Sequence, residues 1–420
     1  MRNTRRLSSF IFLACGSFIA MSSMANADEA VTIPIASPSA LEYHNASNWF
    51  WGLNQGVGLA LPLLLLVTGW GARQYKFLAR IFRERRVLPL ASFAALYFLL
   101  DRSLRLPIAY PWDRAYGEAS GTQNQALVPW LGNHVIEWVL PVGGLTLVVL
   151  LAYWLMEWSQ RRWWLLSSAA VSIVVLAFLL VEPFTQSYKP LGNSPLELHI
   201  AELAARTGVP RSAIVVEHCD PASSCPPGRV IGMGPTRLML LNDALLLQNP
   251  DSWTLQTVAH EAKHFAKDDN IKAFVLLSGL ALVALWVTHR AGHAIIARWS
   301  GPLGFADFAH PASLPLAVLL LNVLYVVALP PVNAFRQHVE LEADRFALEL
   351  TRESTTQAQM TASWTSQKGA VPEWSLFFQL FRASHPSDAE RIRLANAYRP
   401  WLEGKPLVYA NDFAAPVRSK

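Results

Sequence analysis

The sequence predicts a mainly α-helical protein that crosses a membrane several times and carries a small α/β region outside it. Three observations support this fold class. Hydrophobic residues make up 52% of the 420 residues and charged residues only 15%, below the roughly 25% of an average globular domain. The apolar residues are gathered in long blocks. Segments of mixed helix and strand pattern lie between and after the later blocks.

Residues 1–27 have the pattern of an export signal. Arginines precede an apolar run, and Ala25 and Ala27 follow it at the spacing of a cleavage site. The alternative is an uncleaved first membrane helix, although the run is short for a span. Both interpretations place the chain from residue 28 onward outside the cytoplasm.

Six apolar blocks follow, and most reach the roughly 20 residues that a helix needs to cross the hydrocarbon. They lie at about 50–72, 87–105, 134–157, 163–184, 271–289 and 311–332. The second block is the weakest, because Asp101 directly follows its short apolar core. We predict an N-terminal transmembrane region over 28–184 with about four helices. The region 185–420 then contains two further membrane helices.

The basic residues behind the net charge of +5 are concentrated in short loops between apolar blocks, at 73–86, 161–162 and 290–298. Such loops remain in the cytoplasm, so their charge indicates membrane orientation and not nucleic-acid binding. The segments 185–270 and 333–420 then share the outer side, in agreement with the export signal. We therefore expect a multi-pass protein of the bacterial inner membrane that faces the periplasm.

Two histidines four residues apart on a helix project from one face and can bind a single zinc ion. His260 and His264 have this spacing in a helix predicted over 254–267, and Glu261 is placed to take a proton from an activated water. Random placement of 11 His among 420 residues would give this motif roughly 0.02 times per chain. The motif therefore favours one zinc ion per chain.

A catalytic zinc takes three protein ligands and keeps one position open. A charged helical pattern over 333–350 offers Glu340 as the third ligand, with Asp344 one turn later on the same face. Asp344 would orient a liganding histidine by a hydrogen bond. The alternative for Glu340 is a solvated ion pair with Arg336. Together with the histidine motif, on the same side of the membrane, the ligand interpretation is the better one.

The chain resembles the CAAX prenyl protease 1 family of membrane zinc metallopeptidases, relatives of the HtpX proteases, over about 45–400. The resemblance rests on the order and spacing of short stretches, namely Glu182-Pro183-Phe184 to Lys189-Pro190-Leu191, Gly232 to Arg237, Val258 to His264, Glu340 to Ala347, Ser384-His385-Pro386 and Glu390-Arg391. It implies a zincin-like metalloprotease region of the gluzincin type, formed by the two extramembrane segments. It also implies membrane helices that enclose a chamber.

The resemblance assigns roles to individual residues. By resemblance, the zinc ligands are His260, His264 and Glu340, the general base is Glu261, and Asp344 orients a ligand. His385 matches a histidine that steadies the tetrahedral intermediate, and Arg391 matches an arginine that supports the site. The strand near 232–241, with Gly232, Gly234 and Thr236, would be the edge on which an extended peptide lies.

Three departures from the family pattern bear on activity. Lys263 replaces the usual glycine, so a long cation is expected to crowd or charge the cleft. Cys225-Pro226-Pro227-Gly228 replaces an Asn-Ala pair before the substrate strand, and the helix before Glu340 begins differently. None of these departures removes a metal ligand or the base.

Cys219 and Cys225 bracket a short polar loop on the predicted outer side. In an oxidising periplasm we expect them to form a disulfide, with two free thiols as the alternative. A zinc site at this loop is not expected, since only His218 stands nearby.

The sequence thus predicts a membrane-embedded zinc endopeptidase that hydrolyses peptide bonds of membrane or exported proteins. The alternative is a catalytically impaired relative that acts as a membrane adaptor or chaperone. The expected partners are a peptide or protein substrate and the lipid bilayer, without nucleic acid. The sequence does not indicate an oligomeric state.

Overall fold

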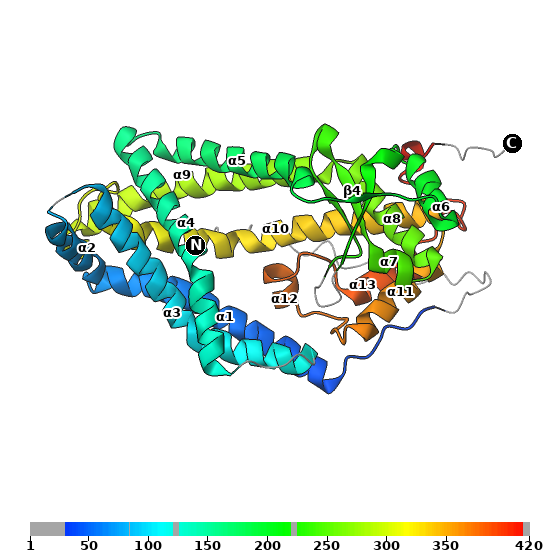
Figure 1. Ribbon diagram of the computed structural model, residues 1–420, viewed down its shortest axis with the longest axis horizontal. Helices are drawn as coiled ribbons and strands as arrows, with labels where there is room; N and C mark the ends of the chain where they lie inside the picture. The colour runs from blue at the N-terminus through cyan, green and yellow to red at the C-terminus, as the bar shows by residue number, and fades with distance from the viewer. Residues whose placement is uncertain (1–29, 84, 121–125, 220–224, 415–420) are drawn as a thin grey trace, which may run out of the picture.

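The computed structural model describes residues 30–83, 85–120, 126–219 and 225–414, so the predicted export signal at 1–27 lies outside the described residues. Helices dominate these residues, and a small sheet lies at one end of an elongated molecule (Figure 1). The predicted fold class is confirmed.

Within the described residues, six helices are long and apolar enough to cross a membrane. They are α1 (Pro38–Val67), α3 (Val87–Ser120), α4 (Leu127–Trp158), α5 (Trp163–Val181), α9 (Asp269–Leu303) and α10 (Leu314–Thr351). Each overlaps one of the six apolar blocks of the sequence. Their large side chains are widely exposed, as expected where lipid replaces water.

A polar network inside the helical bundle explains why charges directly follow the weakest apolar block. Arg105 forms two hydrogen bonds with Asp101, at 2.8 and 2.9 Å, and donates to the Asn54 carbonyl oxygen at 2.8 Å. Asn322 of α10 donates to the Gly58 carbonyl oxygen at 2.6 Å. Charged groups at membrane depth are tolerated when they are paired in this way. The network joins α1 to α3 and α10.

The basic loop expected near residues 73–86 contains a helix, α2 (Trp70–Ile81). Trp70, Phe77 and Ile81 are exposed along one side of α2. An adjacent side carries three cations, namely Arg73, Lys76 and Arg80. This pattern is typical of a helix that lies in the membrane interface. Figure 1 shows α2 and the turns between α4 and α5 and between α9 and α10 at the end opposite the sheet.

The sheet has four strands in the order β1-β2-β4-β3, where β1 is Lys189–Pro190, β2 is Ile214–Glu217, β3 is Gly228–Ile231 and β4 is Leu238–Asn242. β4 is parallel to β2, whereas the β1–β2 and β3–β4 pairs are antiparallel. The apolar side chains of β2 and β4 pack against α6 (Pro195–Ala205) and α8 (Asp251–Ala266). β3 is therefore an edge strand, while β4 lies inside the sheet.

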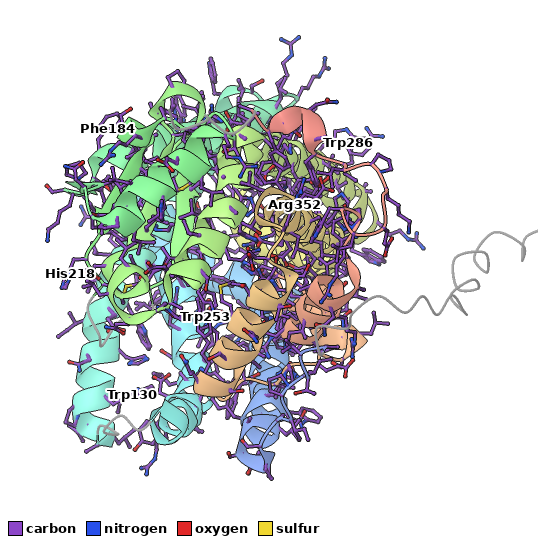
Figure 2. All side chains as sticks on the ribbon, turned by 90° about the vertical axis from the view of Figure 1, so that its right-hand side faces the viewer. Trp130, Phe184, His218, Trp253, Trp286 and Arg352 are labelled. Atoms are coloured by element: carbon purple, nitrogen blue, oxygen red, sulfur yellow. A yellow bond between two sulfur atoms is a disulfide. The ribbon has the colours of Figure 1, made fainter. Side chains whose placement is uncertain are left out.

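Short helices complete this end of the molecule: α7 (Asp243–Gln248), α11 (Ser354–Gln367), α12 (Leu376–Phe381) and α13 (Asp388–Ala397). Figure 2 views this end, with Trp253 in α8 and Arg352 directly after α10. Arg382, after α12, donates to Ser47 Oγ and Asn48 Oδ1 of α1, both at 2.7 Å. The C-terminal segment is thus joined to the first membrane helix.

We expect the substitution Gly292→Ala in α9 to destabilise the bundle. A Cβ atom at this position would lie 2.5 Å from Cε2 of Phe308, a ring that is 1% exposed and packs beside Trp163. Overpacking of this kind costs about 1–3 kcal/mol. Thermal unfolding of the purified protein in detergent measures the effect. Gly279→Ala in the same helix is the control, because no atom apart from the helix's own adjacent backbone lies within 4 Å of its Cβ position. Equal unfolding temperatures for Gly292→Ala and Gly279→Ala would contradict the packing described.

Candidate metal centre

The site forms where α8 packs against α10. Both helices carry buried alanines, among them Ala259 in α8 and Ala343 and Ala347 in α10, and Ala259 and Ala347 belong to one apolar cluster. Such small side chains let two helix backbones approach closely. The polar residues of each helix are thereby brought together, although about 80 residues separate them in the sequence.

His260, His264 and Glu340 meet at this interface, and one ligand atom of each lies within 4.8 Å of the others. His260 Nε2 lies 3.2 Å from Glu340 Oε2 and 3.2 Å from His264 Nε2. His264 Nε2 lies 3.8 Å from Glu340 Oε1. Glu340 therefore contacts the two histidines, as its predicted role as a ligand requires.

Carboxylates hold the other nitrogen of each ring. His260 Nδ1 donates to Asp344 Oδ1 at 3.0 Å, and His264 Nδ1 donates to Asp269 Oδ2 at 2.8 Å. The proton of each neutral ring is thus fixed on Nδ1, which leaves Nε2 free to bind a metal. Asp344 was expected in this role. Asp269, the first residue of α9, was missed, because a single acidic residue at a helix start has no distinctive pattern.

The donor set fits zinc. Two imidazole nitrogens and one carboxylate oxygen are the usual ligands of a catalytic zinc with an open fourth position. Ligand atoms about 2 Å from one tetrahedral centre are separated by roughly 3.3 Å, close to the distances between these three side chains. Each of the three side chains is only partly exposed.

Arg391, from α13, binds both oxygens of Asp344, including the one that accepts from His260. Arg391 Nε donates to Asp344 Oδ2 at 2.7 Å, and Nη2 donates to Oδ1 at 2.6 Å. Asp344 is 1% exposed, and a buried carboxylate requires such partners. Arg391 thus acts on the cluster through Asp344.

His385 lies at the rim of the cluster. Its Nε2 atom is 3.6 Å from Glu340 Oε1, and Ser384 Oγ lies 2.9 Å from Nδ1. When the Ser384 hydroxyl donates to Nδ1, the neutral ring carries its proton on Nε2, which faces the cluster. His385 can therefore donate a hydrogen bond into the site.

Glu261 lies beside the two histidines, and its side chain is buried. Burial raises the pKa of the Glu261 carboxyl above its ordinary value. The backbone of Gly228 approaches it so closely that a Cβ atom there would lie 2.8 Å from Glu261 Cγ. The edge strand β3 thus begins directly against this carboxylate, and only glycine fits at its first position.

Burial by itself would lower the pKa of His260, but its hydrogen bonds to Asp344 and Glu340 raise it to about 10. Without a metal, His260 is therefore protonated at neutral pH. A cation that binds at Nε2 must displace this proton.

A cavity of about 440 Å³ opens over the cluster. Its wall includes the start of β3 and all the clustered side chains, namely Pro226, Pro227, Gly228, Arg229, Val230, His260, Glu261, His264, Glu340, His385 and Arg391. An extended segment at this edge of the sheet would therefore pass directly over the metal ligands.

The free edge of the sheet differs from the one we expected. Gly232, Gly234 and Thr236 lie in the turn between β3 and β4, and the rest of the predicted strand is the internal strand β4. Gly232 has φ +77°, and a Cβ atom there would lie 2.5 Å from the Thr236 carbonyl oxygen. These residues shape a turn, and the edge strand is formed by the residues that precede them.

The groups on the free edge can be named. Asn242 N donates to the Pro227 carbonyl oxygen at 3.1 Å. Because hydrogen-bonded pairs alternate along an antiparallel ladder, the amide and carbonyl groups of Gly228 and Val230 point to the open side. Asn270 Nδ2 donates to the carbonyl oxygens of Val230 and Gly232, at 3.3 and 2.7 Å. A peptide segment that forms backbone hydrogen bonds with β3 would contact the Asn270 side chain at the end of the strand.

A disulfide joins Cys219, after β2, to Cys225, before β3. Asp243 accepts a hydrogen bond from Cys219 N at 3.0 Å and lies 2.6 Å from His218 Nδ1. Figure 2 shows His218 at this end of the molecule. The disulfide and these contacts fix the chain that leads into the edge strand.

Lys263 does not enter the cleft, and the expectation that it would crowd or charge the cleft is wrong. Its side chain is 1% exposed, does not line the cavity and points into the packing between helices. Its ammonium group lies among Asp269, Val339 and Glu342, where α8 meets α9 and α10.

Comparisons with known proteins show the family of the chain. The sequence profile of peptidase family M48 matches residues 190–399, and that of the CAAX prenyl protease N-terminal region, described as five membrane helices, matches residues 38–187. A Bacillus subtilis (strain 168) protein, the uncharacterized metalloprotease YhfN, is 26% identical over 374 residues, which cover 85% of this chain and 84% of that protein.

The fold is similar to that of a solved structure. The crystal structure of Ste24p from S. mikatae matches with a TM-score of 0.68 at 17% sequence identity, over 88% of this chain and 93% of that one. At this identity the likeness concerns the fold. The two profiles together cover both the membrane helices and the metal centre. The chain therefore belongs to peptidase family M48 and is a membrane metallopeptidase of the CAAX protease and HtpX type.

Proposed function

We propose that the protein is a zinc-dependent endopeptidase that cleaves membrane or exported proteins. The observation that carries this proposal is the convergence of His260, His264 and Glu340, with each histidine fixed by a carboxylate. Three possible metal-ligand atoms thus converge on one point, beside the buried carboxylate of Glu261 and the unpaired edge of β3. These are the parts that metal-assisted peptide hydrolysis requires.

Zinc bound by these residues would act as a Lewis acid toward the scissile carbonyl and would make a nearby water more acidic. Glu261 accepts a proton from the attacking water and returns it to the leaving amine. His385 donates from Nε2 to the oxyanion as charge develops there. Arg391 keeps Asp344, and through it His260, in the orientation that the reaction needs.

The substrate lies in an extended conformation along β3. Gly228 offers both its amide and its carbonyl group, and Val230 offers its amide, so the backbone is recognised whatever its side chains. Asn270 already occupies the Val230 carbonyl oxygen. We infer that pairing ends there, which sets the peptide bond to be cleaved over Glu261.

The metal centre faces the periplasm of a bacterial inner membrane. The turn with Arg161 and Arg162 and the amphipathic helix α2 lie at the opposite end of the molecule. Arg290 and Arg298, which we expected in a loop, lie in the second half of α9, which leads to that end. Basic segments of this kind remain in the cytoplasm. The disulfide between Cys219 and Cys225 supports the same orientation, since the periplasm is oxidising.

The first prediction concerns the base. Glu261→Gln should lower kcat by about a hundredfold or more, because the amide cannot accept the proton. Casein or peptide cleavage and the zinc content of purified protein are measured side by side, and the variant should keep one zinc per chain. Undiminished cleavage would contradict the role of Glu261. Zinc bound by the wild type without cleavage of varied substrates would favour an adaptor or chaperone.

The second prediction concerns the proton that His260 releases when zinc binds. Because the metal-free site holds His260 with a pKa near 10, zinc binding at pH 7 should release about one proton, and affinity should rise about tenfold per pH unit near neutrality. Calorimetry in buffers with different ionisation enthalpies measures this release. A binding heat that is the same in every buffer, with an affinity that does not change with pH, would show that His260 is neutral before binding.

The third prediction concerns orientation. With Cys15 replaced by serine, a membrane-impermeant maleimide should label Glu353→Cys from the periplasm. It should not label Arg85→Cys until the inner membrane is opened. Both positions are exposed, and Arg85 lies between α2 and α3 whereas Glu353 follows α10. Figure 1 shows these two segments at opposite ends of the molecule. Reversed labelling would place the metal centre in the cytoplasm and overturn the proposed location.

A further inference from the structure

Lys263 lies inside the zinc-binding motif and is among the largest fully buried side chains of the described residues. Its Nζ atom donates to Asp269 Oδ2 at 2.9 Å and to the Val339 carbonyl oxygen at 2.9 Å, and lies 3.2 Å from Glu342 Oε2. An ammonium group has three donors, and each of them has an acceptor here. A buried cation is stable only when it is paired in this way.

The partner of Lys263 is also the partner of a metal ligand. Asp269 Oδ2 lies 2.9 Å from Lys263 Nζ and 2.8 Å from His264 Nδ1, so a single carboxylate oxygen accepts from both. The position of Asp269 therefore sets the orientation of the His264 ring. The position of Lys263 in turn limits where Asp269 can lie.

The same arrangement occurs on the other histidine. Arg391 donates to Asp344, and Asp344 accepts from His260 Nδ1. Each liganding histidine thus has a carboxylate behind it, and each carboxylate has a buried or largely buried cation behind it. Lys263 contacts the carboxylate that orients His264, just as Arg391 contacts the carboxylate that orients His260.

A second cation contacts Asp269 but cannot replace Lys263. Lys272 Nζ lies 2.6 Å from Asp269 Oδ1, and the Lys272 side chain is 42% exposed, whereas that of Lys263 is 1% exposed. Ion pairs at the surface are screened by water and salt. The charge of the largely buried Asp269 is therefore balanced mainly by Lys263. The contacts of Lys263 with Val339 and Glu342 fix its Nζ atom against α10, the helix that carries Glu340.

We propose that Lys263 is a positioning residue for metal binding, which acts through Asp269 on His264. This inference rests on the proposed zinc site and adds a residue to it. The geometry assigns to Lys263 the task of holding Asp269 where it keeps the His264 proton on Nδ1 and Nε2 free. A cation that lies outside the cleft thereby contributes to the affinity of the site for its metal.

The test is the zinc affinity of Lys263→Met, which removes the charge and keeps a side chain of similar length. Competition with a chromophoric chelator should show a Kd raised about tenfold to a hundredfold, as is usual for residues that orient a ligand. The absorption spectrum of the Co(II)-substituted variant should also change, because the His264 ring is no longer fixed. A Kd within about twofold of the wild-type value would overturn the proposal.

Two matched controls are available in the chain. Lys267→Met removes a cation from the end of the same helix, where it pairs with Asp412, and should leave zinc affinity unchanged. Lys272→Met removes the exposed partner of Asp269 and should have a smaller effect than Lys263→Met. An equal loss in all three variants would mean that net charge, and not the position of Lys263, governs binding.

A double-mutant cycle with Asp269→Asn shows whether Lys263 acts through this carboxylate. In the Asp269→Asn background, Lys263→Met should cause no further loss of zinc affinity, whereas an additional tenfold loss would overturn the proposed route. If Lys263→Met alone does not fold, the double variant can still be compared with Asp269→Asn. The double variant is expected to fold, because it leaves no unpaired charge at position 269. Thermal unfolding of the metal-free proteins identifies that case.

The two proposals fail in different ways. If the wild type binds no zinc, the proposed function is wrong. If the wild type binds one zinc per chain and Lys263→Met binds it equally well, the endopeptidase proposal stands and only the role of Lys263 is lost.

Discussion

The packing of α8 against α10 is the constraint on which the rest of the structure depends. Buried alanines bring the two helices close together, and the charged side chains that project into the interface lose their contact with water. Each of these groups must then find a partner of opposite charge or a hydrogen bond. The result is a set of chains of contacts, Arg391–Asp344–His260 and Lys263–Asp269–His264, that end at one point. Pairing of buried charge and orientation of the proposed metal ligands are therefore the same physical requirement.

The membrane helices take part in this arrangement directly. α10 is one helix from its apolar part to Glu340 and beyond, and Asp269 is the first residue of α9. α8 joins α9 through Asp268, which has φ 46°, a backbone conformation that sharply redirects the chain. The positions of a ligand and of a ligand-orienting carboxylate are thus set by helices that the bilayer holds. The contacts of Arg382 with α1 join a further part of the catalytic end to the membrane region.

The sheet supplies the remaining part of the site. Its order leaves β3 unpaired on the side of the metal ligands, and Gly228 lets the backbone lie against Glu261. The disulfide fixes the chain before β3, while Asn270 occupies carbonyl oxygens at its end. An edge strand that is held at both ends presents a few backbone groups in a fixed register. Under the proposed function, a peptide bond would be placed over Glu261 without recognition of a particular side chain.

The sequence by itself determined the membrane helices, because some 20 consecutive apolar residues leave few alternatives, and it determined the histidine motif, because helical spacing places His260 and His264 on one face. It also led to Glu340 and Asp344 through a second helical pattern. The contributions of Asp269, Lys263 and the edge strand β3 were decided by tertiary structure alone. Their roles depend on which helix lies opposite and on which strand remains unpaired, and both follow from contacts between segments that are distant in the sequence or separated by a turn.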